Sequence, residues 1–135
     1  MKSKIIILIV LFATFFSCKN EVKEEVKPTT EIAAQTDIQL IQFHTEHRCV
    51  TCNNIEKFSK ETIKKNEAIT FVLYNVDDEK NVKVAEQFEA AGTSLYLYNS
   101  KTKATKDLTE MAFMYAKNEG DKFKTELQKE ISAFK

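Results

Sequence analysis

The chain has 135 residues, of which 20 are basic and 20 are acidic, so its formal charge is zero. This balance comes without a cluster of lysine or arginine, so the sequence gives no electrostatic basis for binding nucleic acid, and we expect no such partner. The three cysteines and the placement of apolar residues along the chain are therefore the features to interpret.

Residues 1–18 have the architecture of an export signal. Two lysines, Lys2 and Lys4, precede an uncharged apolar run that is too short to cross a bilayer, which needs about 20 residues. The run ends at Ser17 and Cys18, and the segment resembles a bacterial lipoprotein signal. The resemblance implies that Cys18 becomes the lipidated first residue of an exported protein anchored to the membrane and facing the periplasm or the cell exterior. A simple cleaved signal and an uncleaved anchor are the alternatives.

Residues 19–37 are predicted to be a flexible tether. They alternate charged with small polar residues, contain the only proline and show no sustained apolar period. As a coil, such a segment spans on the order of 25 Å, enough to hold a domain clear of lipid headgroups.

Residues 38–135 are predicted to form a single α/β domain with a mixed sheet of about four strands flanked by helices. Its first elements are a strand at 38–43 and a helix at 52–66. The next strand, 69–76, is almost continuously apolar, as expected for a strand buried on both faces, and we place it at the centre of the sheet. The buried side of the first helix is expected to comprise Cys52, Ile55, Phe58, Thr62 and Ile63.

A second helix is predicted over residues 82–91, with Gly92 as its stop. Strands at 94–99 and 104–108 should form a hairpin around a polar turn. The residues that the helix should bury are Val84, Ala85, Phe88 and Ala91.

The C-terminal part is predicted to be a helix over residues 121–134 with Asp121 as its cap. Residues 109–120 fit either a short helix or a packed loop. The buried stripe of the last helix should be Phe123, Leu127, Ile131 and Phe134.

The segment HTEHRCVTC, residues 44–52, places a C-x-x-C pair between the first strand and the first helix. The order strand, helix, strand, helix, strand, strand, helix, together with the sequence LIQFHTEHRCVTCNNIEKF, resembles the thioredoxin-like family over residues 37–135. The resemblance implies the thioredoxin fold and a thiol–disulfide oxidoreductase whose redox-active disulfide is Cys49–Cys52, without another cofactor. If Cys18 carries lipid, the soluble part holds only this pair, in a compartment where disulfides persist.

The position of the pair at a helix start predicts the chemistry of each cysteine. Free backbone N–H groups and the helix dipole favour a thiolate, and nearby His47 and Arg48 can add positive charge, so the pKa of Cys49 should fall below the free value of about 8.5. Cys49 is then the nucleophile, and the less exposed Cys52 resolves the mixed disulfide. A cysteine-containing protein is the expected substrate. A separate redox partner is also needed, because the sequence has no nucleotide or flavin motif.

Three positions depart from the thioredoxin pattern. Thr93 or Ser94 stands where relatives carry a cis-proline facing the disulfide, so the peptide bond there should be trans. Either residue can tune the pKa of the thiols or contact the substrate. Gln42 replaces a buried carboxylate and cannot shuttle a proton. His47 and Arg48 replace the usual tryptophan in a loop that is one residue longer than in many relatives. Slower or partner-restricted exchange is therefore expected.

The same pair is compatible with three other uses. Cys49 and Cys52 could bind Zn²⁺ or Cu(I) together with His44 and His47. A purely structural bridge is a poor alternative, because closing so short a loop constrains the unfolded chain little. A non-catalytic binding module is the third possibility. Its contact surface would be formed by Tyr96, Tyr98, Met111, Phe113, Met114 and Tyr115.

Overall fold

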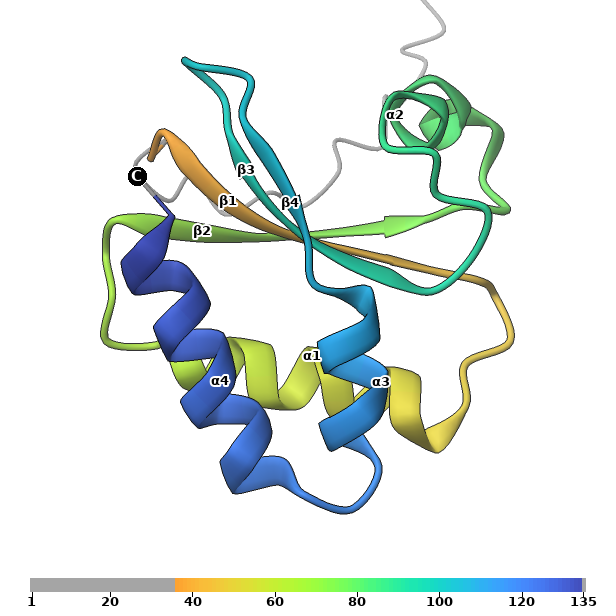
Figure 1. The fold of residues 1–135 in the computed structure, drawn as a ribbon. Helices are drawn as coiled ribbons and strands as arrows, with labels where there is room; N and C mark the ends of the chain where they lie inside the picture. The colour runs from red at the N-terminus through yellow and green to blue at the C-terminus, as the bar shows by residue number, and fades with distance from the viewer. Residues whose placement is uncertain (1–35, 135) are drawn as a thin grey trace, which may run out of the picture. The chain divides into compact units, whose positions relative to one another are not determined.

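The computed structural model describes residues 36–134 (Figure 1). The export signal, Cys18 and nearly all of the predicted tether lie outside the described residues. The strands are Ile38–His44 (β1), Ile69–Asn75 (β2), Ser94–Asn99 (β3) and Thr105–Asp107 (β4). The α-helices are Val50–Ile63 (α1), Val82–Gln87 (α2), Thr109–Ala116 (α3) and Gly120–Ala133 (α4), and a 3₁₀ turn, Glu79–Asn81 (η1), precedes α2.

The four strands form one mixed sheet in the order β2-β1-β3-β4. β1 runs parallel to β2 and antiparallel to β3, and β4 closes the sheet antiparallel to β3. Phe43, near the end of β1, pairs with Tyr74 on one side and with Ser94, the first residue of β3, on the other. This is the topology of the thioredoxin fold, so the predicted α/β fold class is confirmed.

The predicted place of the second strand in the sheet is wrong. β2 lies at an edge, and β1 and β3 occupy the centre. Apart from Ile69, every residue of β2 is only half-buried, whereas β1 buries four consecutive residues, including the polar Gln42. Gln42 makes the sequence of the central strand β1 look less hydrophobic than its burial would suggest. The edge strand β2 is rich in apolar residues because both of its faces are partly covered.

One face of the sheet is covered by three helices, α1, α3 and α4 (Figure 1). Between them lies the larger core cluster, in which side chains from β1 and β3 meet those from the three helices. Its members are Leu40, Ile55, Ile63, Ile69, Leu95, Leu97, Leu108, Ala112, Ala116, Phe123, Leu127 and Ile131.

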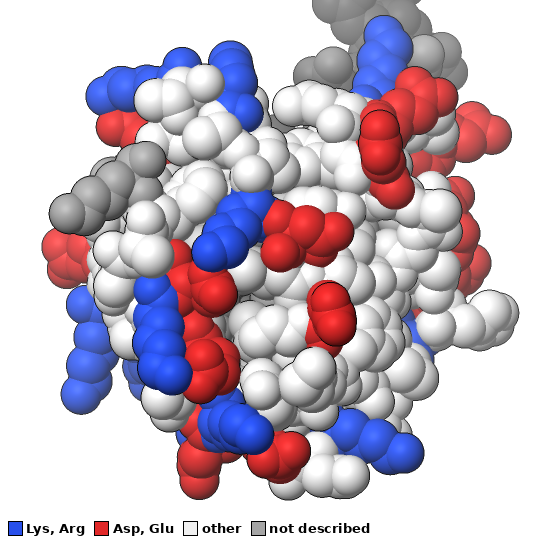
Figure 2. All heavy atoms as spheres, in the orientation of Figure 1, with Lys and Arg blue, Asp and Glu red and all other residues white. Residues whose placement is uncertain are grey.

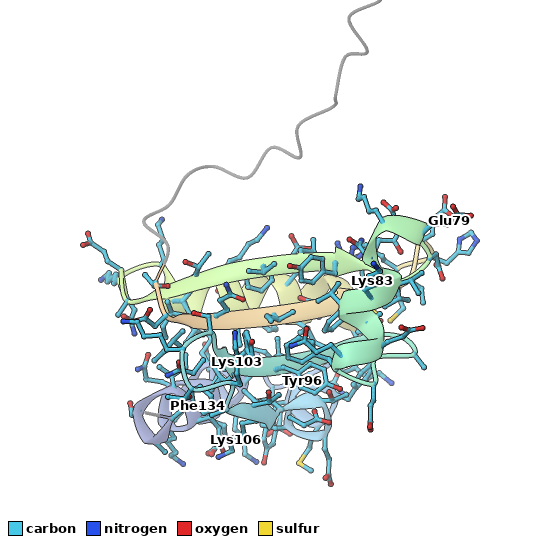
Figure 3. The ribbon with its side chains drawn as sticks, turned by 90° about the horizontal axis from the view of Figure 1, so that it is seen from above. Glu79, Lys83, Tyr96, Lys103, Lys106 and Phe134 are labelled. Carbon is cyan, nitrogen blue, oxygen red and sulfur yellow. The ribbon has the colours of Figure 1, made fainter. Side chains whose placement is uncertain are left out.

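The opposite face carries a smaller core cluster under α2. Figure 3 looks onto this face and shows Lys83 on α2 at one end of the sheet, away from Lys103 in the β3–β4 turn. Phe43 forms the centre of an aromatic group, with ring centroids 5.5 Å from Tyr74, 5.6 Å from Phe88 and 5.9 Å from Tyr96. The apolar face that ends β1 is therefore firmly packed immediately before the chain leaves the sheet for the C-x-x-C segment.

The second helix ends earlier than predicted. α2 stops at Gln87, and Glu89 takes a positive φ of 52°, so the chain reverses before Gly92, whose φ is not positive. Because of this reversal the residue buried near its end is Ala90, not Ala91.

The C-terminal region contains two helices. The undecided residues 109–120 form α3 over most of their length, and α4 follows after a short turn. Asp121 is not the cap of α4, since Glu119 occupies the N-cap position and Asp121 lies in the first turn, paired with Lys124 at 2.9 Å. The predicted stripe is buried at Phe123, Leu127 and Ile131, and Phe134 packs against it half-buried.

Candidate functional site

The C-x-x-C pair lies where the chain passes from the end of β1 into α1. The loop between His44 and Cys49 is held by two hydrogen bonds: Thr45 Oγ1 donates to the carbonyl of His47 at 3.0 Å, and the Glu46 amide donates to Asp77 Oδ2 at 2.7 Å. Both bonds restrict the path of the chain immediately before the first cysteine. The one-residue-longer loop is therefore an ordered structure with its own contacts.

Cys49 is the N-cap residue of α1. Its backbone is extended, with φ −81° and ψ 169°, and its Sγ accepts a hydrogen bond from the Cys52 amide at 3.4 Å. This amide is one of the donors that the first turn of a helix cannot satisfy internally. The Cys49 side chain is exposed, so the structure combines an accessible sulfur with a donor group directed at it.

Cys52 lies one turn into α1 and is only 5 % exposed. Its Sγ is 2.9 Å from Cys49 Sγ, and both are free thiols without a disulfide bond. The hydrogen bond from the Cys52 thiol lowers the pKa of Cys49, the Cys52 backbone N–H lowers it further, and burial opposes both effects weakly. Cys49 therefore ionises at a lower pH than an ordinary thiol, as a nucleophile requires.

The side chain of Arg48 is held against the side of α1 by two contacts. Its Nη1 is 2.6 Å from Glu56 Oε2, and its Nη2 donates to the Cys52 carbonyl at 3.4 Å. Glu56 also binds Lys60, and although burial alone would raise its pKa, the two cations hold that pKa below its usual range. The lowering of the Cys49 pKa arises from Cys52 and nearby backbone amides, without a contribution from Arg48 or His47.

Gln42 lies directly beneath the pair. Its side chain is fully buried, and its Nε2 donates to the Cys52 carbonyl at 3.0 Å, while its Oε1 has no hydrogen-bond partner. The amide therefore fixes the first turn of α1 to the central strand. Because an amide does not titrate, Gln42 cannot accept a proton from either cysteine.

Thr93 approaches the pair from the segment before β3. Its Oγ1 is 3.3 Å from Cys52 Sγ, whereas Ser94 turns its hydroxyl to the Gly92 carbonyl at 3.3 Å. Of the two residues expected opposite the cysteines, Thr93 thus makes the contact. Every peptide bond between residues 36 and 134 is trans, as predicted for this position.

The two histidines lie away from the sulfur atoms. The Nδ1 of His44 is 2.8 Å from the Thr45 carbonyl, and His47 is exposed. In the described part of the chain, no three His, Cys, Asp or Glu side chains come close enough together to hold a metal ion. The four-ligand arrangement considered from the sequence is therefore not assembled here.

Most of the aromatic and methionine residues considered for a binding surface belong to the core. Tyr96 is buried, and Tyr98, Met111 and Tyr115 are half-buried against the two core clusters. Phe113 and Met114 on α3 are exposed, as is Val50 directly after the nucleophile. These exposed residues were not distinguished from the buried ones by sequence, because the periodicity of α3 is weak.

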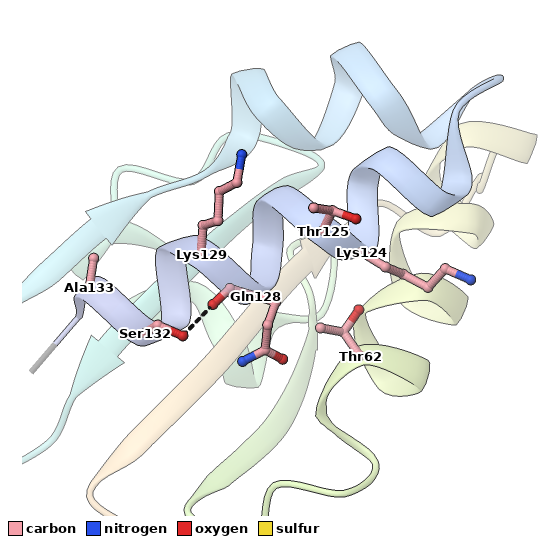
Figure 4. A pocket seen from close by; sticks show the side chains of 7 residues that line it. All are labelled: Thr62, Lys124, Thr125, Gln128, Lys129, Ser132 and Ala133. Carbon is pink, nitrogen blue, oxygen red and sulfur yellow. Dashed lines mark hydrogen bonds between the residues drawn. The ribbon is translucent and has the colours of Figure 1, made fainter.

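One hollow lies at the other end of α1 from the cysteines. It has a volume of about 830 Å³ and is formed by Thr62 and the exposed side of α4, where Ser132 donates to the Gln128 carbonyl at 2.8 Å (Figure 4). Its walls carry hydroxyl, amide and lysine side chains, without a cysteine, a histidine or a carboxylate. On the face of the molecule that Figure 2 shows, basic and acidic side chains are interspersed.

No family model and no curated protein matches the chain. A solved structure described as "Structure of a malarial protein" is similar at 20 % identity, covering 58 % of this chain and 94 % of that one, with a TM-score of 0.42. This likeness is too low to support a functional assignment. Within residues 36–134, every helix is too short or too polar to cross a membrane.

Proposed function

We propose that the protein is a thiol–disulfide oxidoreductase of the thioredoxin-like family that acts on cysteines of other proteins. One observation carries this proposal: an exposed Cys49 caps α1 with its thiol in contact with the buried Cys52. A structural bridge would not need an accessible sulfur whose pKa is lowered, whereas exchange requires both properties.

The geometry suits a two-step exchange. In the reductive direction, the Cys49 thiolate attacks one sulfur of a substrate disulfide, and the second substrate sulfur leaves as a thiolate. Cys52 then loses its proton and attacks Cys49 Sγ, which forms the Cys49–Cys52 bond and releases the first substrate sulfur as a thiolate. Two electrons pass to the substrate, and oxidation of a substrate dithiol follows the same path in reverse.

A separate dithiol or disulfide partner must restore the pair after each cycle.

The metal-binding alternative receives no support, because the histidines do not join the cysteines among the described residues. The non-catalytic binding module is also less favoured, since a binding surface has no use for a free thiol pair with a lowered pKa.

The proposal places this exchange outside the cytosol. The apolar run before Cys18 resembles a lipoprotein signal, and residues 19–37 would hold the domain away from the membrane. Substrates would then be exported proteins, in a compartment where disulfides persist.

Trapping of substrates in cells tests the proposal. In the full chain, Cys52→Ala removes the resolving thiol, so partner proteins should accumulate as mixed disulfides on Cys49 that a reductant dissolves. The matched control is the double variant Cys49→Ser, Cys52→Ala, which should trap nothing. If both variants give the same pattern on non-reducing gels, the protein is not exchanging disulfides.

A further inference from the structure

The second step of the exchange needs a route for a proton. Cys52 must ionise before it can displace the substrate, yet it is only 5 % exposed. Beneath it lies Gln42, whose amide is already used as a donor to the Cys52 carbonyl and cannot take up a proton. The proton of the resolving thiol therefore needs another acceptor.

Thr93 is placed to supply that route. Its hydroxyl is 3.3 Å from Cys52 Sγ, and its side chain is half-buried, so the residue that contacts the buried sulfur is itself in part accessible to solvent. A hydroxyl group both donates and accepts hydrogen bonds, which allows it to receive one proton while passing on another.

The other polar groups around Cys52 are directed elsewhere. Gln42 and Arg48 both approach its carbonyl oxygen, and Arg48 is also paired with Glu56. Ser94, next to Thr93, donates to a backbone carbonyl. Among the described residues, Thr93 and Cys49 thus provide the side-chain hydrogen-bond contacts of the Cys52 sulfur.

We infer that Thr93 is a catalytic residue that relays the proton of Cys52 during resolution of the mixed disulfide. This role rests on the proposed thiol–disulfide exchange. As the Cys52 proton passes to Thr93 Oγ1, the hydroxyl proton of Thr93 passes to a solvent water, so Thr93 ends as a neutral hydroxyl. The Cys52 sulfur forms a bond to Cys49 Sγ, the bond between Cys49 and the substrate sulfur breaks, and its electron pair leaves on the substrate thiolate.

Both steps can be followed separately with 5,5′-dithiobis(2-nitrobenzoate). When one equivalent is mixed with the reduced full chain carrying Cys18→Ser, the background used for wild type and variants alike, the first thionitrobenzoate reports attack by Cys49, and the second reports displacement by Cys52. In Thr93→Val, a near-isosteric change, we expect an unchanged first phase and a second phase slower by on the order of 100-fold, the lower end of what a positioned proton-transfer group contributes. In Thr93→Ser, which keeps the hydroxyl, the second phase should stay close to that of the wild type.

The outcomes distinguish this inference from the proposed function. If the wild type and Thr93→Val release the second equivalent at the same rate, the relay is wrong and the exchange stands. If Thr93→Val slows both phases equally, or if Thr93→Ser is as slow as Thr93→Val, the residue has a packing role and the relay is also wrong. If the wild type releases no second equivalent, Cys52 does not displace the leaving group, and both the exchange and the relay fail.

Discussion

Cys49 owes its chemistry to contacts made within one helical turn. The Cys52 thiol and the Cys52 amide both reach its sulfur, at 2.9 Å and 3.4 Å, because an N-cap side chain and the residue three positions later face each other at a helix start. Hydrogen bonds from Cys52 and nearby backbone amides lower this pKa, and Arg48 is paired with Glu56. The reactivity of the nucleophile should therefore depend on α1 being folded.

At the residue scale, this predicts a pH-dependent stability of the reduced protein. Because the pKa of Cys49 is lower in the folded than in the unfolded chain, the unfolded chain binds more protons in the window between the two pKa values. Stability from this group is thus fully present above the unfolded pKa of about 8.5 and is lost as the pH falls through the folded pKa. We expect urea midpoints under reducing conditions to rise with pH across this window in the wild type relative to Cys49→Ser. A wild-type minus variant difference that stays flat with pH would contradict the account.

The sequence located the reacting residues better than their supporting contacts. The C-x-x-C spacing and the predicted helix start were sufficient to indicate Cys49 and Cys52, whereas the sequence left Thr93 and Ser94 as alternatives opposite them, and the contact with Cys52 is made by Thr93. The ion pair between Arg48 and Glu56 could not be foreseen, because it depends on the path of the loop before α1. Glu56 pairs both with Arg48 and with Lys60, its neighbour one turn later on α1.

At the scale of elements, the start of α1 is fixed from two sides. Gln42 ties its first turn to β1, and Asn54 Nδ2 donates to the Ala116 carbonyl at the end of α3 at 2.9 Å. Further along, Phe58 packs against Phe123 of α4, with ring centroids 5.8 Å apart. β1, α3 and α4 therefore hold α1 in the position that presents the cysteines.

Gly120, the first residue of α4, allows this packing. A Cβ added there would lie 2.5 Å from Phe58 Cζ, whereas one added at Gly92 would meet nothing within 4 Å. Neither glycine has a positive φ, so backbone strain does not enter the comparison. We expect Gly120→Ala to lower the free energy of unfolding by about 1–3 kcal/mol through overpacking, and Gly92→Ala to leave it unchanged or raise it by up to about 1 kcal/mol.

Chemical denaturation of the two alanine variants provides the measurement. Equal stabilities for both would show that the α1–α4 contact is not tightly packed at Phe58.

Element types were more predictable than their boundaries and neighbours. The strands and the long helices follow from their apolar periods, but β2 was misplaced because an apolar run does not say how many neighbours a strand has. The end of α2 was missed because Glu89, not a glycine, adopts the left-handed conformation there. The sequence does not distinguish a helix from a loop over α3, because the faces of this helix differ little in polarity.

At the scale of the whole molecule, the fold presents the pair at one end of the sheet. β1 is central and ends beside the start of β3, so the segment that follows β1 brings Cys52 next to Thr93, 41 positions later in the chain. The helix layer of α1, α3 and α4 packs on one face of the sheet (Figure 1). Topology, rather than local sequence, thus assembles the residues proposed for the two steps.

The proposed export of the protein gives a prediction for the intact chain. If Cys18 is lipidated, the mature protein should fractionate with membranes, and Cys18→Ser should move it to the soluble fraction while Cys49→Ser leaves it membrane-bound. Fractionation with detection of a metabolically incorporated fatty acid measures both properties. Unlabelled wild-type protein in the soluble fraction would contradict the anchor but not the exchange chemistry.

The pH dependence of Cys49 alkylation tests the central claim most directly. The reduced wild type and Cys52→Ala would be treated with iodoacetamide over a range of pH, with the modified cysteine identified by peptide mass. The account predicts a wild-type midpoint below the free-cysteine value of about 8.5, and a higher midpoint in Cys52→Ala because the Cys52 thiol makes the largest contribution. A wild-type midpoint at or above that of free cysteine would contradict the claim that the start of α1 holds Cys49 ready to attack.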